Sequence, residues 1–276
     1  MKDEYVMGID NGGTVTKAAI YDRKGQVLAI ASKSTQMLTP REFHTERSID
    51  ELWAANVEVI KKAIEQSGID ASQIKGVAVT GHGNGLYLVD EEGHPVRNGI
   101  ISTDSRAKEY VERWQRSPEF LTDILPKTMQ SIWAGQPVAL LAWLKDFEPE
   151  TLQKARYIFM VKDLIRFYLT GEAFLELTDI SGTNLINVRD CKYDDELLAW
   201  WELDELRDKL PPIKRSTECC GKITDDVARL TGLCAGTPVS GGVFDISASS
   251  IASGINSLDK MAIVTGTWSI NEYVTD

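Results

Sequence analysis

The sequence predicts an α/β fold in which helices flank a mixed β-sheet, and three observations support this prediction. Short strand-like runs separated by glycine-containing turns fill residues 5–34. Residues 48–66 then carry apolar side chains at helical spacing, and residues 74–80 return to an apolar strand pattern. A sheet that begins antiparallel and gains a parallel strand after a crossover helix accounts for all three.

The first strands are expected at residues 5–10, 17–22 and 27–34, where the runs are apolar or alternate apolar and polar side chains. Turn residues at 12–13 and 24–25 separate them. Because these connections are too short for a crossover helix, the three strands must be antiparallel neighbours.

The next element is a helix expected from Ser48 to about Gln66. Ser48 and Glu51 predict a capping box at its start, and Gly68 supplies its end. One face of this helix is apolar, with Ile49, Leu52, Trp53, Val57, Ile60 and Ile64. The strand at residues 74–80 then suits a covered, central position in the sheet.

Later elements continue the alternation of strands and helices. A strand is expected at residues 85–90, and residues 104–205 are expected to be mostly helical, with helices at 137–145 and 161–169; then come a strand at 238–243, a helix at 246–252 and hairpin strands at 260–266 and 268–275. Three antiparallel strands, a helix and a parallel strand open the ribonuclease-H-like fold of the actin and hexokinase type. This is the fold class that the sequence predicts.

Composition narrows the classes of partner. The chain of 276 residues carries a net charge of −11, which repels nucleic acid. No apolar run approaches the roughly 18 residues that span a bilayer, and residues 1–5 lack the start of a signal peptide. The four cysteines and three histidines form no metal-binding motif. A cytoplasmic protein without nucleic-acid or membrane partners is therefore expected.

The turn between the first two strands has the composition of a phosphate-binding loop. Asp10 closes a strand, and Gly12 and Gly13 let backbone amides approach an anion without a Cβ in the way. Lys17 begins another strand, whereas a Rossmann loop or a P-loop opens into a helix. A plain β-hairpin with a glycine turn is the alternative, and the aspartate at the strand end favours a phosphate site.

Three further segments carry candidate ligand groups. Small residues around His82 form an open loop after a strand, for which a tight turn or an oxyanion hole is the alternative; the chain has no Gly-x-Ser-x-Gly elbow, which argues against a hydrolase. Asp104 and Arg106 lie at a strand-to-helix junction, where a helix cap is the alternative. Asp245 follows two glycines at the start of a helix, where it too could be a cap.

In this combination the motifs resemble the FGGY carbohydrate kinase family. The glycine turn is similar to the family's phosphate-binding hairpin, which implies ATP as phosphate donor and Mg²⁺ placed by Asp10. The resemblance also implies phosphate contacts from Gly12, Gly13, Thr14 and Lys17. Gly13 stands where the family often has threonine, which removes a hydroxyl donor but keeps the backbone amides.

The resemblance extends to the sugar site. It implies that His82, Gly83 and Asn84 contact the sugar, and that Asp104 accepts hydrogen bonds from sugar hydroxyls with Arg106 as its support.

Departures from the common pattern bear on the substrate. Gly83 and Asn84 take the Met and His positions of the xylulose kinase pattern, and Ser102 takes the place of a tryptophan. The form Gly-His-Gly-x-Gly-Leu-Tyr is most similar to L-xylulose kinases, which implies L-xylulose or a related ketose. A kinase for D-xylulose or glycerol stays an alternative.

The last two matches concern the chemistry itself. Residues 242–248 resemble the family segment that carries the general base, which implies this role for Asp245. Gly266 and Thr267 resemble the second phosphate motif. Two packing segments also match: the helix at residues 137–145, in which Trp143 is expected in the core, and Thr178-Asp179, expected in a structural turn near the sugar.

Family members are about twice as long as this chain, which implies a domain division. Residues 1–254 are expected to form the N-terminal domain with the sugar site and the base, and residues 255–276 the first hairpin of an incomplete C-terminal ATP-binding domain. A fragment of a kinase and a natural truncation both stay open, as does a non-catalytic sugar-binding or regulatory module. Sugar and ATP are the expected partners, the fragment alone is expected to be inactive, and the oligomeric state stays open, a homodimer among the options.

Overall fold

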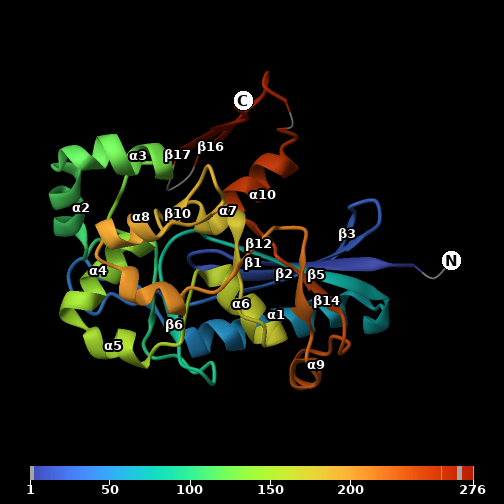
Figure 1. The fold of residues 1–276 in the computed structure, drawn as a ribbon. Coiled ribbons are helices and arrows are strands. Elements are labelled where there is room, and N and C mark those ends of the chain that lie inside the picture. The colour runs from blue at the N-terminus through green and yellow to red at the C-terminus, as the bar shows by residue number, and fades with distance from the viewer. Residues whose placement is uncertain (1–2, 256, 266–268, 276) are drawn as a thin grey trace.

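The computed structural model describes residues 3–255, 257–265 and 269–275, and a seven-stranded mixed sheet forms its centre (Figure 1). The strands run in the order β13-β14-β5-β1-β2-β3, with β15 also paired to β5. Their bounds are β1 Tyr5–Asn11, β2 Val15–Asp22, β3 Val27–Ser34, β5 Ile74–Gly81, β13 Cys219–Lys222, β14 Pro238–Ser240 and β15 Val243–Phe244.

The described helices are α1 Ile49–Ser67, α2 Lys108–Gln115, α3 Leu125–Thr128, α4 Pro137–Phe147, α5 Pro149–Lys154, α6 Val161–Thr170, α7 Leu177–Ile180, α8 Asp195–Trp200, α9 Asp225–Thr231 and α10 Asp245–Ala252. Irregular helical turns lie at Ala71–Gln73, Phe120–Ile124 and Asp204–Lys209. No helix in the described ranges is long and apolar enough to cross a membrane.

Within the ranges that the structure describes, five two-stranded ladders lie outside the main sheet. They pair β4 Glu46–Arg47 with β7 Gly99–Ile100, β6 Tyr87–Val89 with β8 Tyr157–Phe159, β9 Leu175–Glu176 with β12 Ile213–Lys214, β10 Ile186–Asn187 with β11 Lys192–Tyr193, and β16 Met261–Thr265 with β17 Ser269–Tyr273. The stretch 104–205, predicted to be mostly helical, therefore also holds short strands.

The predicted opening of the fold is confirmed. β1 pairs antiparallel with β2, β2 antiparallel with β3, and β1 parallel with β5. Helix α1 makes the crossover between β3 and β5, and it ends at Gly68, whose φ of 66° places it in the left-handed region that favours glycine. These elements agree with their sequence signals because hydrophobic period and turn residues are local properties of the chain.

The predicted capping box at the start of α1 is only half formed. The Ser48 side chain accepts a hydrogen bond from the Glu51 amide at 3.2 Å, as expected. The Glu51 carboxylate, however, accepts from the Gln36 amide at 3.0 Å. The Glu51 side chain thus binds the amide of Gln36, just after β3, in place of the Ser48 amide that a capping box requires.

The strand predicted at residues 238–243 is divided into β14 and β15 by Gly241 and Gly242. Gly242 has a φ of +78°, and a Cβ there would lie 2.0 Å from the Val79 carbonyl oxygen. Neither the backbone conformation nor the contact admits a side chain. The break lets β15 continue beside β5, and α10 begins at Asp245, one residue earlier than predicted.

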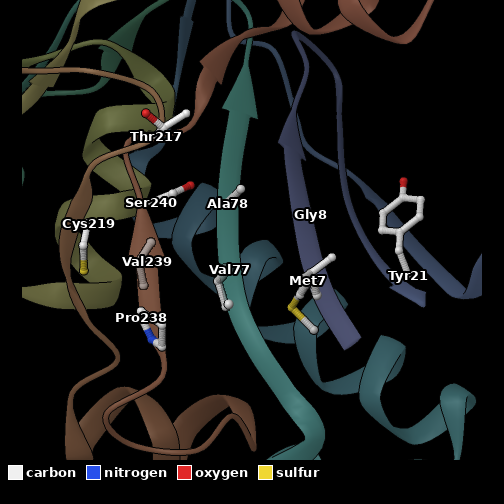
Figure 2. A pocket seen from close by; sticks show the side chains of 12 residues that line it. Met7, Gly8, Tyr21, Val77, Ala78, Thr217, Cys219, Pro238, Val239 and Ser240 are labelled. Atoms are coloured by element: carbon white, nitrogen blue, oxygen red, sulfur yellow. The ribbon is translucent and has the colours of Figure 1, made fainter. Parts of the chain in front are cut away.

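One face of the sheet is covered and the other is largely open. Alternate side chains of β1 bury Met7 and Ile9 on the face against which α1 and α6 pack, whereas Val6 on the other face is 49% exposed. On that open face a groove of about 480 Å³ crosses β1, β5 and β14 between Gly8, Ala78 and neighbouring residues (Figure 2). None of the predicted site residues that the structure describes lines this groove.

Candidate active site

The site is built around the junction of β15 and α10. β15 pairs in parallel with the end of β5, with Val243 opposite Thr80. Because successive side chains of a strand point to opposite sides, Val243 and Phe244 line two different cavities. Asp245 follows directly and lines the same cavity as Phe244. The helix start therefore stands between the two.

The first cavity brings most of the predicted sugar-binding residues together. It measures about 220 Å³ and is lined by His82, Gly83, Asn84, Ser102, Trp133, Phe244, Asp245, Ile246 and Ile270. His82, Gly83 and Asn84 come from the loop after β5, and Asp245 comes from the start of α10. We refer to this cavity as the sugar cavity.

Asn84 lines this cavity and carries an unsatisfied polar atom. Its Oδ1 atom is buried and accepts no hydrogen bond from the described residues. Its backbone φ of 59° lies in the left-handed region, which asparagine tolerates better than most residues. A buried acceptor without a partner costs free energy, so a hydroxyl-bearing ligand in the cavity would stabilise it.

His82 is a neutral hydrogen-bonding group in the same wall. Burial, together with the charge of Arg47, lowers the pKa of this histidine to about 4. Nδ1 lies 3.2 Å from the Gly83 carbonyl oxygen, and Nε2 lies 3.0 Å from the Tyr87 hydroxyl. Because a carbonyl only accepts, Nδ1 carries the proton and Nε2 accepts from Tyr87.

The ring of Phe244 leaves no room for a side chain at Gly83. A Cβ on this residue would lie 2.1 Å from the Phe244 ring, so no larger residue fits while the ring stays in place. The loop after β5 and the segment before Asp245 therefore pack directly against each other. This contact joins the two walls of the sugar cavity.

The second cavity holds the predicted phosphate residues Asp10 and Lys17. It measures about 420 Å³ and is also lined by Thr80, Val243 and Ala248, among others. The antiparallel register places Asp10 opposite Lys17, and their charged groups lie 3.3 Å apart. The Asp10 side chain is 35% exposed. We refer to this cavity as the phosphate groove.

The Asp10 carboxylate is a suitable group to hold Mg²⁺. Magnesium ions bind proteins through one or two carboxylates and complete their shell with waters and phosphate oxygens. A single, partly exposed carboxylate at an open groove meets this requirement. Asp10 is also close enough to raise the pKa of Asp245, so the two carboxylates share one electrostatic environment.

The glycine turn is held open by a buried arginine. Arg47 is 1% exposed, and its guanidinium donates to the Gly12 carbonyl at 3.2 Å, to the Thr35 hydroxyl at 3.0 Å and to the Gly13 carbonyl. Within the described residues, the amides of Gly13 and Thr14 donate to no other group. The Gly12 amide donates to the Val15 carbonyl at 3.0 Å. The carbonyls of the turn are thus fixed from behind, while the amides of Gly13 and Thr14 stay free for an anion.

The environment of Asp245 is that of a general base. Burial, together with the neighbouring charges of Asp10 and Glu272, raises the pKa of its carboxyl to about 6. Phe244 occupies the cap position of α10, so Asp245 is not the helix cap. A carboxylate with this pKa is charged at neutral pH and is a better proton acceptor than an ordinary aspartate.

A family model describes this arrangement of residues. The N-terminal domain of the FGGY family of carbohydrate kinases matches residues 5–252. The chain belongs to the FGGY family.

Relatives and solved structures of kinases agree with this membership. The chain is 39% identical to the probable L-xylulose kinase of Pasteurella multocida (strain Pm70) over 98% of this chain and 56% of the relative, and 39% identical to the L-xylulose/3-keto-L-gulonate kinase of Escherichia coli (strain K12) over 99% and 54%. The gluconate kinase of Lactobacillus acidophilus superposes with a TM-score of 0.89 at 25% identity, over 97% of this chain and 53% of that one.

A ligand-bound xylulose kinase from Lactobacillus acidophilus superposes with a TM-score of 0.88 at 25% identity, over 96% of this chain and 53% of that one. The predicted actin and hexokinase type of fold is thereby confirmed. The chain spans about half the length of the curated relatives it matches.

Not every predicted FGGY site residue reaches the cavities. The Asp104 carboxylate is fully buried and accepts from the Thr45 amide at 2.6 Å and from Arg106 at 2.8 and 2.9 Å. Ser102, not Asp104, lines the sugar cavity. Contact of Asp104 and Arg106 with sugar stays a prediction, and the alternative of a helix cap is wrong, because α2 has Ala107 at its cap.

The structure adds FGGY site residues that sequence patterns did not indicate. Arg47 stands alone before the helix start, where nothing in the spacing distinguishes it from a surface arginine. Phe244, Trp133 and Ile270 also line the sugar cavity, but their mainly apolar side chains look the same in the sequence as those of core residues. The predicted phosphate residues Gly266 and Thr267 lie outside the described residues.

Proposed function

We propose that this protein is an ATP-dependent kinase that transfers the γ-phosphate of ATP to a hydroxyl of L-xylulose or a related ketose. The observation that carries the proposal is the position of Asp245, which lines the sugar cavity and is close enough to Asp10 of the phosphate groove for the charge of Asp10 to raise its pKa. Family membership and the names of the relatives support the same reaction.

Each part of the site has a task in this reaction. Asp245 accepts the proton of the attacking sugar hydroxyl as the oxygen bonds to phosphorus. The free amides of the glycine turn, with Lys17, bind phosphate oxygens, and Asp10 places Mg²⁺. When bound, Mg²⁺ neutralises charge on the transferred phosphate. The remaining catalysis is the alignment of the two reactants.

Residues in and near the loop after β5 support an L-ketose as the substrate. Gly83 leaves room that Phe244 fills, and Asn84 offers an unsatisfied acceptor. Ser102 lines the cavity with a small hydroxyl where the common family pattern has a tryptophan. These changes alter both the size and the hydrogen bonding of the pocket, and they support L-xylulose over D-xylulose or glycerol.

We also propose a domain boundary at about residue 254. Helix α10 ends at Ala252, the family match ends at the same residue, and β16 and β17 pair only with each other within the described chain. On this view residues 255–276 begin the domain that binds the rest of ATP. Ile270 reaches the sugar cavity from this hairpin, as expected for a site between two domains.

A panel of pentuloses, hexuloses and polyols, assayed with ATP and Mg²⁺ on the protein at its natural length, tests the proposal. We expect kcat/KM for L-xylulose to exceed that for D-xylulose by at least about tenfold, because mismatched hydroxyls leave buried polar groups unpaired. An equal kcat/KM for D-xylulose or glycerol would contradict L-xylulose as the preferred substrate. Sugar binding without turnover at saturating ATP would contradict the proposed kinase activity and would identify a sugar-binding module.

A further inference from the structure

The backbone that leads into Asp245 is held by side chains from three other elements. This segment, residues 241–244, has its first carbonyl bound by Arg166 at 2.9 Å and its third by the Thr80 hydroxyl at 2.7 Å. Its last amide donates to the Thr178 hydroxyl at 2.9 Å. The third contact is the one nearest to the proposed base.

The Thr178 hydroxyl uses both of its hydrogen-bonding capacities. It accepts from the Phe244 amide and donates to the Glu176 carboxylate at 2.6 Å. The same carboxylate lies 3.2 Å from the Lys162 ammonium group. A continuous chain of polar contacts therefore runs from a buried lysine to the residue that precedes Asp245.

This chain starts in a cluster of charges that is closed to solvent. The cluster, which we call the buried ion cluster, consists of Lys162, Asp163, Arg166, Glu176 and Asp179, each at most 1% exposed. Asp163 contacts Lys162 at 2.8 Å and Arg166 at 2.6 Å. Displacing any member would leave a desolvated charge without its partner, so the cluster is a rigid point of attachment.

Both ends of the segment are attached to this cluster. Arg166, which binds the first carbonyl, is a member, and Thr178 links the last amide to Glu176. None of the cluster's side chains lines the sugar cavity or the phosphate groove. Its hydrogen bonds and ion pairs bear on the geometry of the segment; the charge of Asp245 reaches the cluster only as one of the causes that raise the pKa of Asp179.

The position of Phe244 matters for both walls of the sugar cavity. Its backbone carries Asp245 as the next residue, and its ring packs where a Cβ on Gly83 would lie. If the Phe244 amide lost its acceptor, the base and the aromatic wall would be free to shift together. Misplacement of a reacting group by about 1 Å costs on the order of a hundredfold in rate.

We propose that Thr178 is a positioning residue for the reaction: its hydroxyl holds Asp245 against the sugar by tying the Phe244 amide to the buried ion cluster. The inference rests on the proposed kinase function and adds to it a specific residue outside both cavities. The methyl group of Thr178 has no part in it, so serine should replace threonine and valine should not.

The experiment compares three variants of the protein at its natural length. Thr178→Val removes the hydroxyl with little change of shape, and Thr178→Ser keeps it. Thr231→Val is the matched control. The Thr231 hydroxyl likewise both donates, here to the Val227 carbonyl (2.7 Å), and accepts, here from the Leu233 amide (3.3 Å), but it lies in α9, which packs against α1. Steady-state kinetics and hydrogen exchange of the Phe244 amide are measured for each.

We expect Thr178→Val to lower kcat about 10- to 100-fold while KM for the sugar changes less than about threefold. Thr178→Ser and Thr231→Val should stay within about threefold of wild-type kcat. Exchange of the Phe244 amide should accelerate at least about tenfold in Thr178→Val alone.

Wild-type kcat in Thr178→Val, or a Thr178→Ser variant as slow as Thr178→Val, overturns the inference. A wild-type protein that phosphorylates no sugar overturns the proposed function and, with it, the catalytic part of the inference. The exchange measurement still applies in that case: unchanged exchange of the Phe244 amide in Thr178→Val shows that Thr178 does not hold this segment.

Discussion

At the scale of single residues, the environment of Asp245 separates it from an ordinary surface aspartate. Its carboxyl is partly buried beside Asp10 and Glu272, and these surroundings raise its pKa to about 6. Raising the pKa makes the carboxylate a stronger base but disfavours its charged form. Activity and stability should therefore respond to this residue in opposite directions.

Replacing Asp245 by Asn should abolish turnover and leave sugar binding largely intact. The amide keeps the shape of the side chain but cannot accept the hydroxyl proton, so we expect kcat to fall by at least about a hundredfold. Coupled kinetic assays and sugar titration calorimetry on the protein at its natural length check this. A variant with turnover near wild type would remove Asp245 from the mechanism.

The pH dependence of activity should show the raised pKa directly. Because Asp245 must be deprotonated to act as a base, kcat/KM should fall as pH drops through about 6, not through the usual range near 4. The measurement is a pH–rate profile at constant ionic strength from about pH 4.5 to about pH 8, a range that brackets the expected pKa of about 6. An acid limb below pH 5 contradicts the assignment.

The same shift predicts how stability depends on pH. The folded pKa lies above the unfolded value, so the favourable contribution of Asp245 to stability is fully present below about pH 4 and is lost as pH rises through about 6. Asp245→Asn should therefore raise Tm by about 2–4 °C at pH 7.5 and not at pH 4. Calorimetry of both proteins at the two pH values checks the sign; a lower Tm of the variant at pH 7.5 contradicts it.

At the scale of elements, the turn between β1 and β2 depends on a residue from β4. Arg47 binds two carbonyls of the turn and the Thr35 hydroxyl, all from the buried side. Because a turn with fixed carbonyls has fixed amides, this contact prepares the anion site before the ligand arrives. The glycines provide access, and the arginine provides the shape.

Arg47→Met should therefore weaken the binding of ATP more than the binding of sugar. We expect KM for ATP to rise about tenfold or more and KM for the sugar to change by less, since two turn carbonyls lose their donor. Arg23→Met is the control, because Arg23 pairs with Glu4 at 3.4 Å on an exposed surface. An equal rise of both KM values would show a general loss of structure instead of a specific effect on the turn.

At the scale of the whole molecule, the described chain contains one side of the proposed site in full. The glycine turn, Asp245 and the residues that line the sugar cavity, apart from Ile270, lie in the part of the chain matched by the FGGY N-terminal domain. The hairpin of β16 and β17 joins no other sheet within the described residues, and the relatives are about twice as long. The proposed domain division therefore assigns the rest of the ATP clamp to a second domain.

Residues 1–276 alone should show no ATP-dependent kinase activity. Phosphoryl transfer depends on positioning and charge stabilisation by both sides of the site, and one side is insufficient. A coupled assay at high enzyme concentration and saturating ATP checks this, with the protein at its natural length as the positive control. Robust turnover by residues 1–276 would refute the proposed domain division.

Local patterns in the sequence carried much of this description. The alternation of residues 5–34, the helical period of α1 and the glycines before Asp245 each predicted their element because the signal lies within one stretch of chain. The same locality predicted His82 and Asp245 as site residues. The sequence by itself therefore determined the fold class, the family and most polar groups of the sugar cavity.

The tertiary structure alone decided which side chains share a cavity and which stand behind it. Asp104 lies behind Ser102, although both belong to one motif. Arg47 and Thr178 act on segments 34 and 66 residues away, to Gly13 and Phe244. Spacing along the chain carries no record of such contacts, because they form only when the sheet and its crossover connections bring distant segments together.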